Sequence, residues 1–227
     1  MSLDDREDLR WQGGAMCNLY SATTNQEAVR RLFPKISDRV GNLPALATIY
    51  PDQEAPIIRN GSAGDLELVM ARWGMPSPAF ALEGKKTDRG VTNIRNTASP
   101  HWRRWLGVEN RCLVPVTAFA EPARGADGKS RNQWFAAVDS DQQMFFAGLW
   151  TRWTSVRKLA EGEVAADLYG FLTTEPNDLV RQVHPKAMPV ILTEPMEWEI
   201  WMTAPWADAR ALQRPLEAGL MKAVDRP

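Results

Sequence analysis

The chain has 227 residues, 44% of them hydrophobic and ten of them tryptophan, which suffices for one domain with a substantial core and excludes a disordered or collagen-like polymer. The formal net charge of −1 excludes a strong overall attraction to nucleic acid, so a polyanion would need a local basic patch. The candidate patches are Arg30–Arg31, His101–Trp105 and Arg152–Lys158, and each is explained more simply as a solvated face. Two cysteines, no secretory leader and no apolar run of the ~18 residues that span a membrane predict a cytoplasmic protein with no disulfide framework and no membrane partner.

Residues 1–15 are polar and end in Gly-Gly-Ala, so we expect a disordered leader there and a single domain over residues 16–227. In this interpretation Met16 is the true start, and Cys17 becomes the first residue once Met16 is removed. Cys17 would then carry an α-amine and a thiol, which titrate near pH ~8 and ~8.5. Such a residue can condense with an aldehyde, amine first and thiol second, and close a five-membered ring. An internal cysteine cannot.

The first half of the chain alternates short apolar runs with turn signals. The elements expected there, in order, are a strand over 17–22, a helix from a capping box at Thr24–Glu27 to about residue 33, an irregular loop over 34–56, a hairpin of strands 55–59 and 66–73, and an exposed loop containing Lys85 and Lys86.

The second half has longer apolar runs and no βαβ rhythm, so we expect an α+β fold with a mainly antiparallel, barrel-like sheet flanked by helices. The elements expected are a short helix over 99–106, a strand over 111–119, a hairpin of strands 133–138 and 144–150, a strand over 166–174, a helix over 176–183 and a helix from residue 193 with Met196, Ile200 and Trp201 on its apolar face.

The chain has only two histidines. His101 lies in a His-Trp-Arg-Arg-Trp run and is interpreted as a surface or structural residue. His184 is also explained most simply as structural, but its position between a helix and a buried strand, near Lys186, suits a general acid.

Three further residues are candidates for the site. Glu121 follows a hydrophobic strand, and a buried carboxyl group there would have a raised pKa and exchange protons near neutral pH. Asn93 and Arg95 are two positions apart on an extended segment, so their side chains point to the same face and could bind one phosphate together.

A metal site is not predicted. Cys112 lies inside an apolar run and is expected to be a buried core thiol. A zinc site built from Cys17, Cys112, His101 and His184 would have none of the usual paired spacings. The sequence indicates no cofactor either, because phosphate loops and nucleotide-binding glycine motifs are absent.

Six stretches, in order, resemble the SOS-response-associated peptidase family, whose SRAP domain processes abasic sites in DNA. The resemblance covers Met16 to about Trp201. The stretches are Met16–Tyr20 for the family's Met-Cys-Gly-Arg-Phe/Tyr, Trp73–Pro76 for Trp-Gly-x-x-Pro, Asn93–Arg95 for Asn-Ala-Arg, Arg111–Pro122 for Arg-Cys-Leu-Val-Pro-x-x-Gly-Phe-x-Glu-Trp, Phe146–Trp150, and His184–Leu192 for His-Asp-Arg-Met-Pro-Val-Ile-Leu.

The resemblance implies a reaction with abasic sites in single-stranded DNA. The Cys17 amine would form a Schiff base with the opened deoxyribose, and the thiol would close a thiazolidine, leaving a stable crosslink. Asn93 would orient Cys17, and Glu121 and His184 would move protons. A Schiff base without ring closure would permit a lyase side reaction, and the family has also been interpreted as an autopeptidase that removes residues preceding its cysteine.

The resemblance also implies the DNA contacts: Arg95 on phosphate, Trp73 and Pro51 against bases, and Lys186 where the family has arginine. The chain departs from the family at Asn18, Leu19 and Pro122 and by one inserted residue before Met188, which affects expectations of DNA affinity more than of chemistry. We expect a monomer whose partner is single-stranded DNA containing abasic sites.

Two other classes of function stay open at this point. One is a peptidase that uses Cys17 as a cysteine or amino-terminal nucleophile on peptides, and the other is a non-catalytic single-strand binder. The sequence favours the crosslinking enzyme because Cys17, Asn93, Glu121 and His184 all match the family, while nothing resembles a peptide-specificity pocket.

Overall fold

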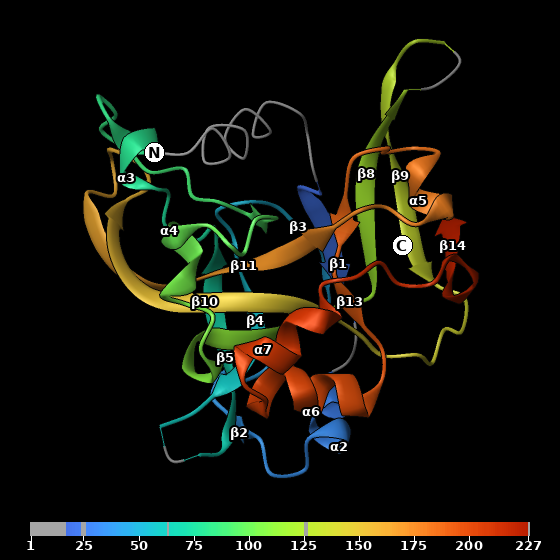
Figure 1. Cartoon of the computed structure of the whole chain (residues 1–227), viewed down its shortest axis with the longest axis horizontal. Coiled ribbons are helices and arrows are strands. Elements are labelled where there is room, and N and C mark those ends of the chain that lie inside the picture. The colour runs from blue at the N-terminus through green and yellow to red at the C-terminus, as the bar shows by residue number, and fades with distance from the viewer. Residues whose placement is uncertain (1–16, 24–25, 63, 125–126, 227) are drawn as a thin grey trace.

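The computed structural model describes residues 17–23, 26–62, 64–124 and 127–226, and five of its strands close into a barrel (Figure 1). All neighbours pair antiparallel except β11 and β5, which run parallel with Tyr169 opposite Trp73 and complete the ring. The predicted α+β class with a barrel-like sheet is confirmed. The order around the barrel is β5 (Leu66–Trp73), β4 (Glu54–Asn60), β7 (Arg111–Val116), β10 (Met144–Val156) and β11 (Glu163–Thr174).

A second sheet positions the beginning of the described chain. In it β1 lies between β8 and β3 and pairs antiparallel with both, with Leu19 opposite Ala120. The segment that contains Cys17 therefore enters beside the middle of β8. The strand order of this sheet is β14 (Met221–Val224), β9 (Ser130–Ala137), β8 (Ala118–Arg124), β1 (Leu19–Ala22) and β3 (Leu46–Ile49).

The remaining elements are short and extend or cover the sheets. No helix within the described ranges combines the length and apolar character needed to cross a membrane. The elements are β2 (Ser37–Asp38), β6 (Asn93–Ile94), β12 (Met188–Pro189) and β13 (Ile191–Leu192), with helices α2 (Gln26–Leu32), α3 (Ala79–Leu82), α4 (Pro100–Arg103), α5 (Asp178–Arg181), α6 (Pro195–Thr203) and α7 (Trp206–Ala209), and 3-10 turns at Val108–Asn110, Arg210–Leu212 and Ala218–Leu220.

Side chains alternate along the barrel strands between two cores, as the period of a strand requires. On β10, Phe146 joins the cluster inside the barrel, whereas Phe145 joins the outer cluster, which Trp198 of α6 covers. Both faces of these strands are thus apolar. This explains why their sequences read as continuous hydrophobic runs rather than as alternating ones.

The predicted hairpin of strands 133–138 and 144–150 is wrong. β9 belongs to the second sheet, where it pairs with β8 and with β14 near the carboxyl end, while β10 belongs to the barrel and pairs with β7, β11 and β13. The connection at 139–143 therefore carries the chain from one sheet to the other instead of reversing it within one sheet.

Other boundaries differ less. The loop predicted over 34–56 contains β2, β3 and the start of β4, and the helix predicted over 99–106 is helical only at Pro100–Arg103. In α6 the buried residues are Trp198, Trp201 and Met202, whereas Met196, predicted to face the core, is 65% exposed. The first two residues of the predicted capping box lie outside the described residues; α2 begins at Gln26.

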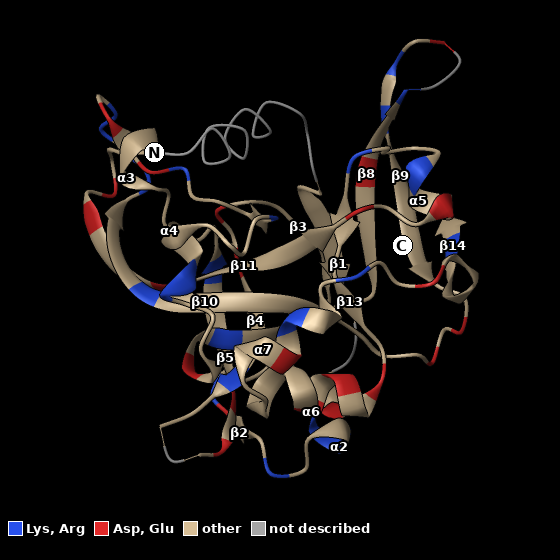
Figure 2. Ribbon diagram, in the orientation of Figure 1, with Lys and Arg blue, Asp and Glu red and all other residues tan. Residues whose placement is uncertain are grey.

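Charged residues of both signs are interspersed over the ribbon (Figure 2). In two of the three patches considered from sequence, an arginine is paired with an acid: Arg30 with Asp38 at 2.6 Å, and Arg152 with Asp167 at 3.1 Å. Arg157 is buried and serves an internal role described below.

Candidate active site

Cys17 lies just before β1 and is held by three polar contacts. Its backbone N–H donates to the Glu121 carboxyl group, its carbonyl oxygen accepts a hydrogen bond from Asn93 Nδ2 at 3.1 Å, and its Sγ lies 3.7 Å from the Leu19 carbonyl oxygen. Only 1% of the residue is exposed. The backbone nitrogen and carbonyl oxygen of Cys17 thus contact Glu121 and Asn93, two side chains that the sequence predicted for the site.

Glu121 reaches Cys17 because β8 runs beside β1. The strand continues through Glu121 to Arg124 instead of ending there, so the carboxyl group is buried, with 1% of the residue exposed. Burial raises the pKa of Glu121 well above its ordinary range, and the hydrogen bond from Cys17 offsets only part of that rise. The carboxyl group of Glu121 therefore keeps its proton to a higher pH than an exposed glutamic acid does.

His184 approaches the other side of the Glu121 carboxyl group. Its position follows from α5, which begins at the Asn177 cap and ends shortly before the histidine. Nδ1 lies 2.9 Å from the Ala187 carbonyl oxygen and 3.8 Å from Glu121 Oε2. Because a carbonyl oxygen only accepts, Nδ1 is the protonated nitrogen and Nε2 is the one able to accept a proton in the neutral ring.

Asn93 connects the site to the barrel through β6, which pairs in parallel with β11, Asn93 opposite Phe171. Its Nδ2 donates to Thr92 Oγ1 at 2.9 Å as well as to Cys17. Among the described residues, Asn93 Oδ1 and Glu121 Oε2 are buried without a hydrogen-bond partner. These two acceptors beside one cysteine are available to hydrogen-bond donors of a substrate or of water.

The Cys17 thiol stays protonated in this setting. Burial raises its pKa, and the nearby charge of Glu121 raises it further. A neutral thiol is a poor nucleophile, so the sulfur is unsuited to lead an attack on a carbonyl group. The arrangement favours chemistry in which the nitrogen of Cys17 reacts first.

The predicted DNA-contacting residues separate into two groups. Arg95 is 40% exposed on its side chain and lies 3.6 Å from Glu175, Lys186 is exposed, and Pro51 is half-buried at the edge of a groove. Trp73 is fully buried: its ring packs against Tyr20, Tyr169 and Phe171, and its Nε1 donates to the Thr92 carbonyl oxygen. This placement contradicts the predicted stacking of Trp73 on a base.

The remaining histidine and cysteine lie outside this group of residues. His101 packs edge-on to Trp102 and Trp105 and contacts the Pro76 carbonyl oxygen at 2.9 Å, and Cys112 is fully buried in the barrel core. Both structural interpretations are confirmed. Within the described ranges, no group of three or more His, Cys, Asp or Glu side chains is placed to hold a metal ion.

Sequence reasoning missed two features near Cys17. Tyr50, next to Pro51, is 46% exposed and lines a second hollow together with Arg124 and Arg131. Lys85 and Lys86 line the groove beside Asn93. The Lys-Lys pair between glycines was a signal for a cationic surface beside the site, but we predicted only an exposed loop there.

Fold and site together define an α+β barrel protein with a buried cysteine as its candidate nucleophile. The sequence model of the family described as SOS response associated peptidase (SRAP) matches residues 16–225, and the chain therefore belongs to that family. Membership makes it an SOS-associated protein related to DNA damage, and the family name also suggests an enzymatic role.

Solved structures agree in fold. A protein from Bordetella bronchiseptica is 29% identical with a TM-score of 0.70, over 92% of this chain and 100% of that one. One from Bacteroides thetaiotaomicron is 22% identical with a TM-score of 0.68, over 91% and 90% of the two chains. A phage-related protein from Bordetella bronchiseptica is 20% identical with a TM-score of 0.65, over 92% and 93%. No curated protein gave a significant match.

The amide of Asn93 provides a first testable prediction. Replacing Asn93 with alanine leaves the buried Cys17 carbonyl oxygen without its donor, so we expect a loss of about 1–3 kcal/mol in the free energy of unfolding, measured in urea. Asn132→Ala, on the exposed part of β9, is the matched control and should change the stability by less than about 0.5 kcal/mol. Equal effects of the two substitutions would contradict the structural role of Asn93.

Proposed function

We propose that the protein crosslinks itself to abasic sites in single-stranded DNA through Cys17. The observation that carries the proposal is the set of contacts on the Cys17 backbone, with Glu121 on its nitrogen and Asn93 on its carbonyl oxygen. A site that holds a cysteine by these two atoms presents its nitrogen to an acid–base group. Such a site is suited to amine chemistry, which requires Cys17 to be the first residue.

The reaction begins with a proton transfer. An α-ammonium group and a carboxylate at this position can exchange one proton to give a neutral amine and a neutral carboxylic acid. Burial favours that neutral pair because it penalises both charged forms. Glu121 thereby converts the amino group of Cys17 into a nucleophile at neutral pH.

The amine nitrogen then adds to the aldehyde carbon of the opened deoxyribose, and the carbonyl oxygen takes the proton from Glu121. The nitrogen returns one of its own protons to the Glu121 carboxylate, and the carboxylic acid so formed protonates the hydroxyl oxygen, which leaves as water. The resulting iminium nitrogen gives its last proton to Glu121, which leaves a neutral imine. His184, 3.8 Å from Glu121, exchanges protons between this carboxyl group and the solvent. Finally the Cys17 sulfur adds to the imine carbon and its proton moves to the nitrogen, so the product equals protein plus DNA minus one water.

Three of the predicted contacts suit the strand that carries the lesion. Arg95 and Lys186 provide exposed cations for phosphates, and Pro51 provides a small apolar surface for a base. Electrostatic contacts of this kind hold a single strand without base-specific hydrogen bonds, as a protein that must accept lesions in any sequence requires.

The test compares two forms of the protein on an oligonucleotide with one abasic site. Protein starting at Cys17 should give a heat-stable shifted band on a denaturing gel, with the mass of the sum minus one water. Protein that retains Met1–Met16 should give none, because its Cys17 nitrogen is an amide. An oligonucleotide whose abasic aldehyde has been reduced to an alcohol is the matched control. A stable band with that control, or none with the abasic site, would overturn the proposal.

A second candidate function follows from the same contact. Glu121 accepts a hydrogen bond from the nitrogen of the peptide bond that precedes Cys17, as expected for a group that assists cleavage there. In this autopeptidase reaction the chain would release residues 1–16 and expose the amine that the crosslink needs. Mass measurement of purified full-length protein over time tests it, and retention of the whole chain under all conditions would exclude self-cleavage. Residues 1–16 lie outside the described part of the chain.

A further inference from the structure

A groove of about 730 Å³ opens directly beside the candidate active site. Asn18, Pro51 and Asn93 line one part of it, so it reaches the residues that contact or adjoin Cys17. Three exposed cations line another part, namely Lys85, Lys86 and Arg89. Within the described ranges, no Asp or Glu lines this groove.

The cations belong to a loop between α3 and β6 that has almost no regular structure, so something else must fix it. Part of the answer is Asp88, which is buried and accepts hydrogen bonds from Ser77 N at 3.0 Å, Ser77 Oγ at 2.6 Å and Gly90 N at 2.8 Å. Its carboxylate joins Ser77, just before α3, to Gly90 near the end of the loop, and Lys85 and Lys86 between them are both exposed.

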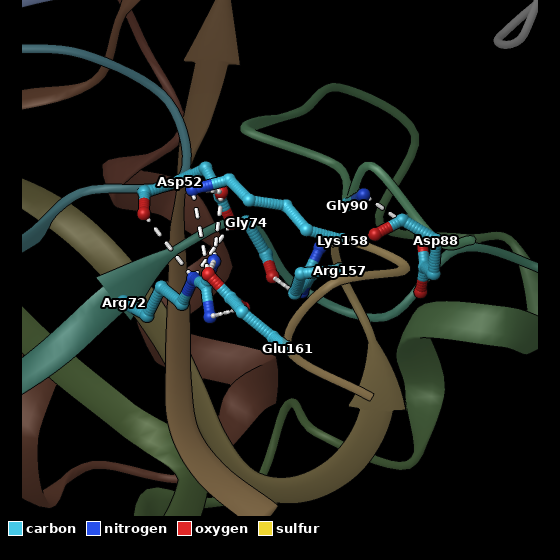
Figure 3. Close-up of polar contacts among 8 residues, drawn as sticks. All are labelled: Asp52, Arg72, Gly74, Asp88, Gly90, Arg157, Lys158 and Glu161. Carbon is cyan, nitrogen blue, oxygen red and sulfur yellow. Dashed lines mark hydrogen bonds and ion pairs between the residues drawn. The ribbon is translucent and has the colours of Figure 1, made fainter. Parts of the chain in front are cut away.

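Arg157 fixes the same loop from outside. It projects from the turn that joins β10 to β11, and its guanidinium group donates to the carbonyl oxygens of Asp88, at 3.1 Å, and of Gly74 (Figure 3). Only 7% of the residue is exposed. Gly90, at φ +78°, is required here because a Cβ atom would occupy the space of the guanidinium group.

The neighbouring residues of this turn hold Asp52, which adjoins Pro51, another lining residue of the groove. Lys158 lies 3.2 Å from Asp52, and Glu161 pairs with Arg72 at 2.9 Å, which in turn binds Asp52 at 2.6 Å (Figure 3). Asp52 has a left-handed backbone, with φ +71°, and directly follows Pro51. One turn of the β10–β11 ribbon therefore fixes both the cationic loop and the Pro51 edge.

We propose that this groove binds the phosphates of the single strand next to the lesion, and that Arg157 is the positioning residue that holds its cationic wall. The proposal rests on the proposed function, since it takes single-stranded DNA as the ligand. Arg157 itself is too buried to contact the strand; it acts through the loop that presents Lys85, Lys86 and Arg89.

The first experiment removes the charges. A labelled oligonucleotide of deoxythymidines without an abasic site is titrated with protein at several salt concentrations, and binding is followed by fluorescence anisotropy. For Lys85→Ala with Lys86→Ala we expect the slope of log K against log salt to fall by about 1.4, which is about 0.7 per lost phosphate contact. The control is Lys35→Ala with Lys222→Ala, two exposed lysines on other parts of the fold. An unchanged slope in the groove variant would overturn the proposal.

The second experiment keeps the positive charge at position 157 but removes the planar guanidinium group. Arg157→Lys replaces the two nitrogens that reach the Asp88 and Gly74 carbonyl oxygens with a single one, so we expect the dissociation constant for the same oligonucleotide to rise several-fold. The crosslinking rate at saturating abasic DNA should stay unchanged. Hydrogen exchange should increase in peptides covering residues 75–91 and not in the barrel strands. Arg152→Lys, an exposed arginine of the same ribbon, is the control.

A lower melting temperature of Arg157→Lys with an unchanged dissociation constant would mean that Arg157 is only structural and would overturn its positioning role. Should that variant fail to fold, Asp88→Asn loosens the same loop from inside and takes its place. The two proposals fail separately. If no crosslink forms but the Lys85 and Lys86 substitutions still lower the salt slope, the crosslinking reaction is refuted. If the crosslink forms normally but those substitutions leave the salt slope unchanged, the proposed role of the groove is refuted.

Discussion

Replacing Cys17 with serine should abolish the heat-stable crosslink while leaving the imine step intact. The α-amine of the substituted first residue can still attack the aldehyde, but a hydroxyl group gives no stable ring equivalent to the thiazolidine. We therefore expect at least a roughly 100-fold lower yield of stable product on a denaturing gel, and recovery of a stable band when borohydride is present to reduce the imine. The protein must begin at residue 17 in both forms.

The matched control is Cys112→Ser, which changes the other cysteine without touching the site. Cys112 is fully buried in the barrel, so this variant should lose stability but keep the crosslink. A stable band from Cys17→Ser without borohydride would show that sulfur is not needed. Loss of the band in Cys112→Ser, with the fold intact, would place the reacting thiol in the barrel core.

Replacing Glu121 with glutamine should slow crosslinking and at the same time stabilise the fold. Glutamine keeps the size and can accept the hydrogen bond from the Cys17 nitrogen, but it cannot take or return a proton. Loss of one acid–base group typically costs a factor of about 100 to 10,000 in rate. Single-turnover kinetics at saturating abasic DNA would measure this loss.

The gain in stability has a defined pH dependence. Burial raises the pKa of Glu121 in the folded protein above the ~4.3 of an unfolded chain, so the unfolded state loses its proton first as the pH rises. Wild-type stability therefore falls above that pH until the folded carboxyl group also ionises. Glu121→Gln should be no more stable than wild type at about pH 4 and more stable at about pH 7, by about 1 kcal/mol or roughly 2–4 °C in Tm. A variant less stable than wild type at neutral pH would contradict the buried, raised-pKa carboxyl group.

The gathering of Cys17, Asn93, Glu121 and His184 was predictable because each belongs to a short motif whose order along the chain resembles a family. Local reasoning alone would have left His184 as a structural residue and Glu121 as the first solvated residue after a strand. Their proximity depends on β1 lying beside β8 and on α5 ending near both, and neither pairing leaves a signal in the local sequence.

The errors have the same origin. A tryptophan at the end of a strand can face solvent or a closed barrel, and Trp73 faces the barrel only because β11 returns in parallel to β5. The hairpin predicted across 139–141 failed because β9 finds its partners in β8 and in β14, the last strand of the chain. The prediction that Met196 faces the core failed because the apolar residues of α6 lie on most sides of the helix. Their periodicity therefore did not identify the buried face.

The burial of Cys17 has a consequence for the lifetime of the protein in a damaged cell. DNA lesions often arise together with peroxides and electrophiles, which modify exposed thiolates fastest. In the proposed reaction, a thiol that is 1% exposed and kept protonated by its surroundings would be protected from both kinds of reagent until a strand brings an aldehyde to the neighbouring nitrogen. A nucleophile that the proposed crosslink uses only once per molecule would thereby stay reactive during oxidative stress.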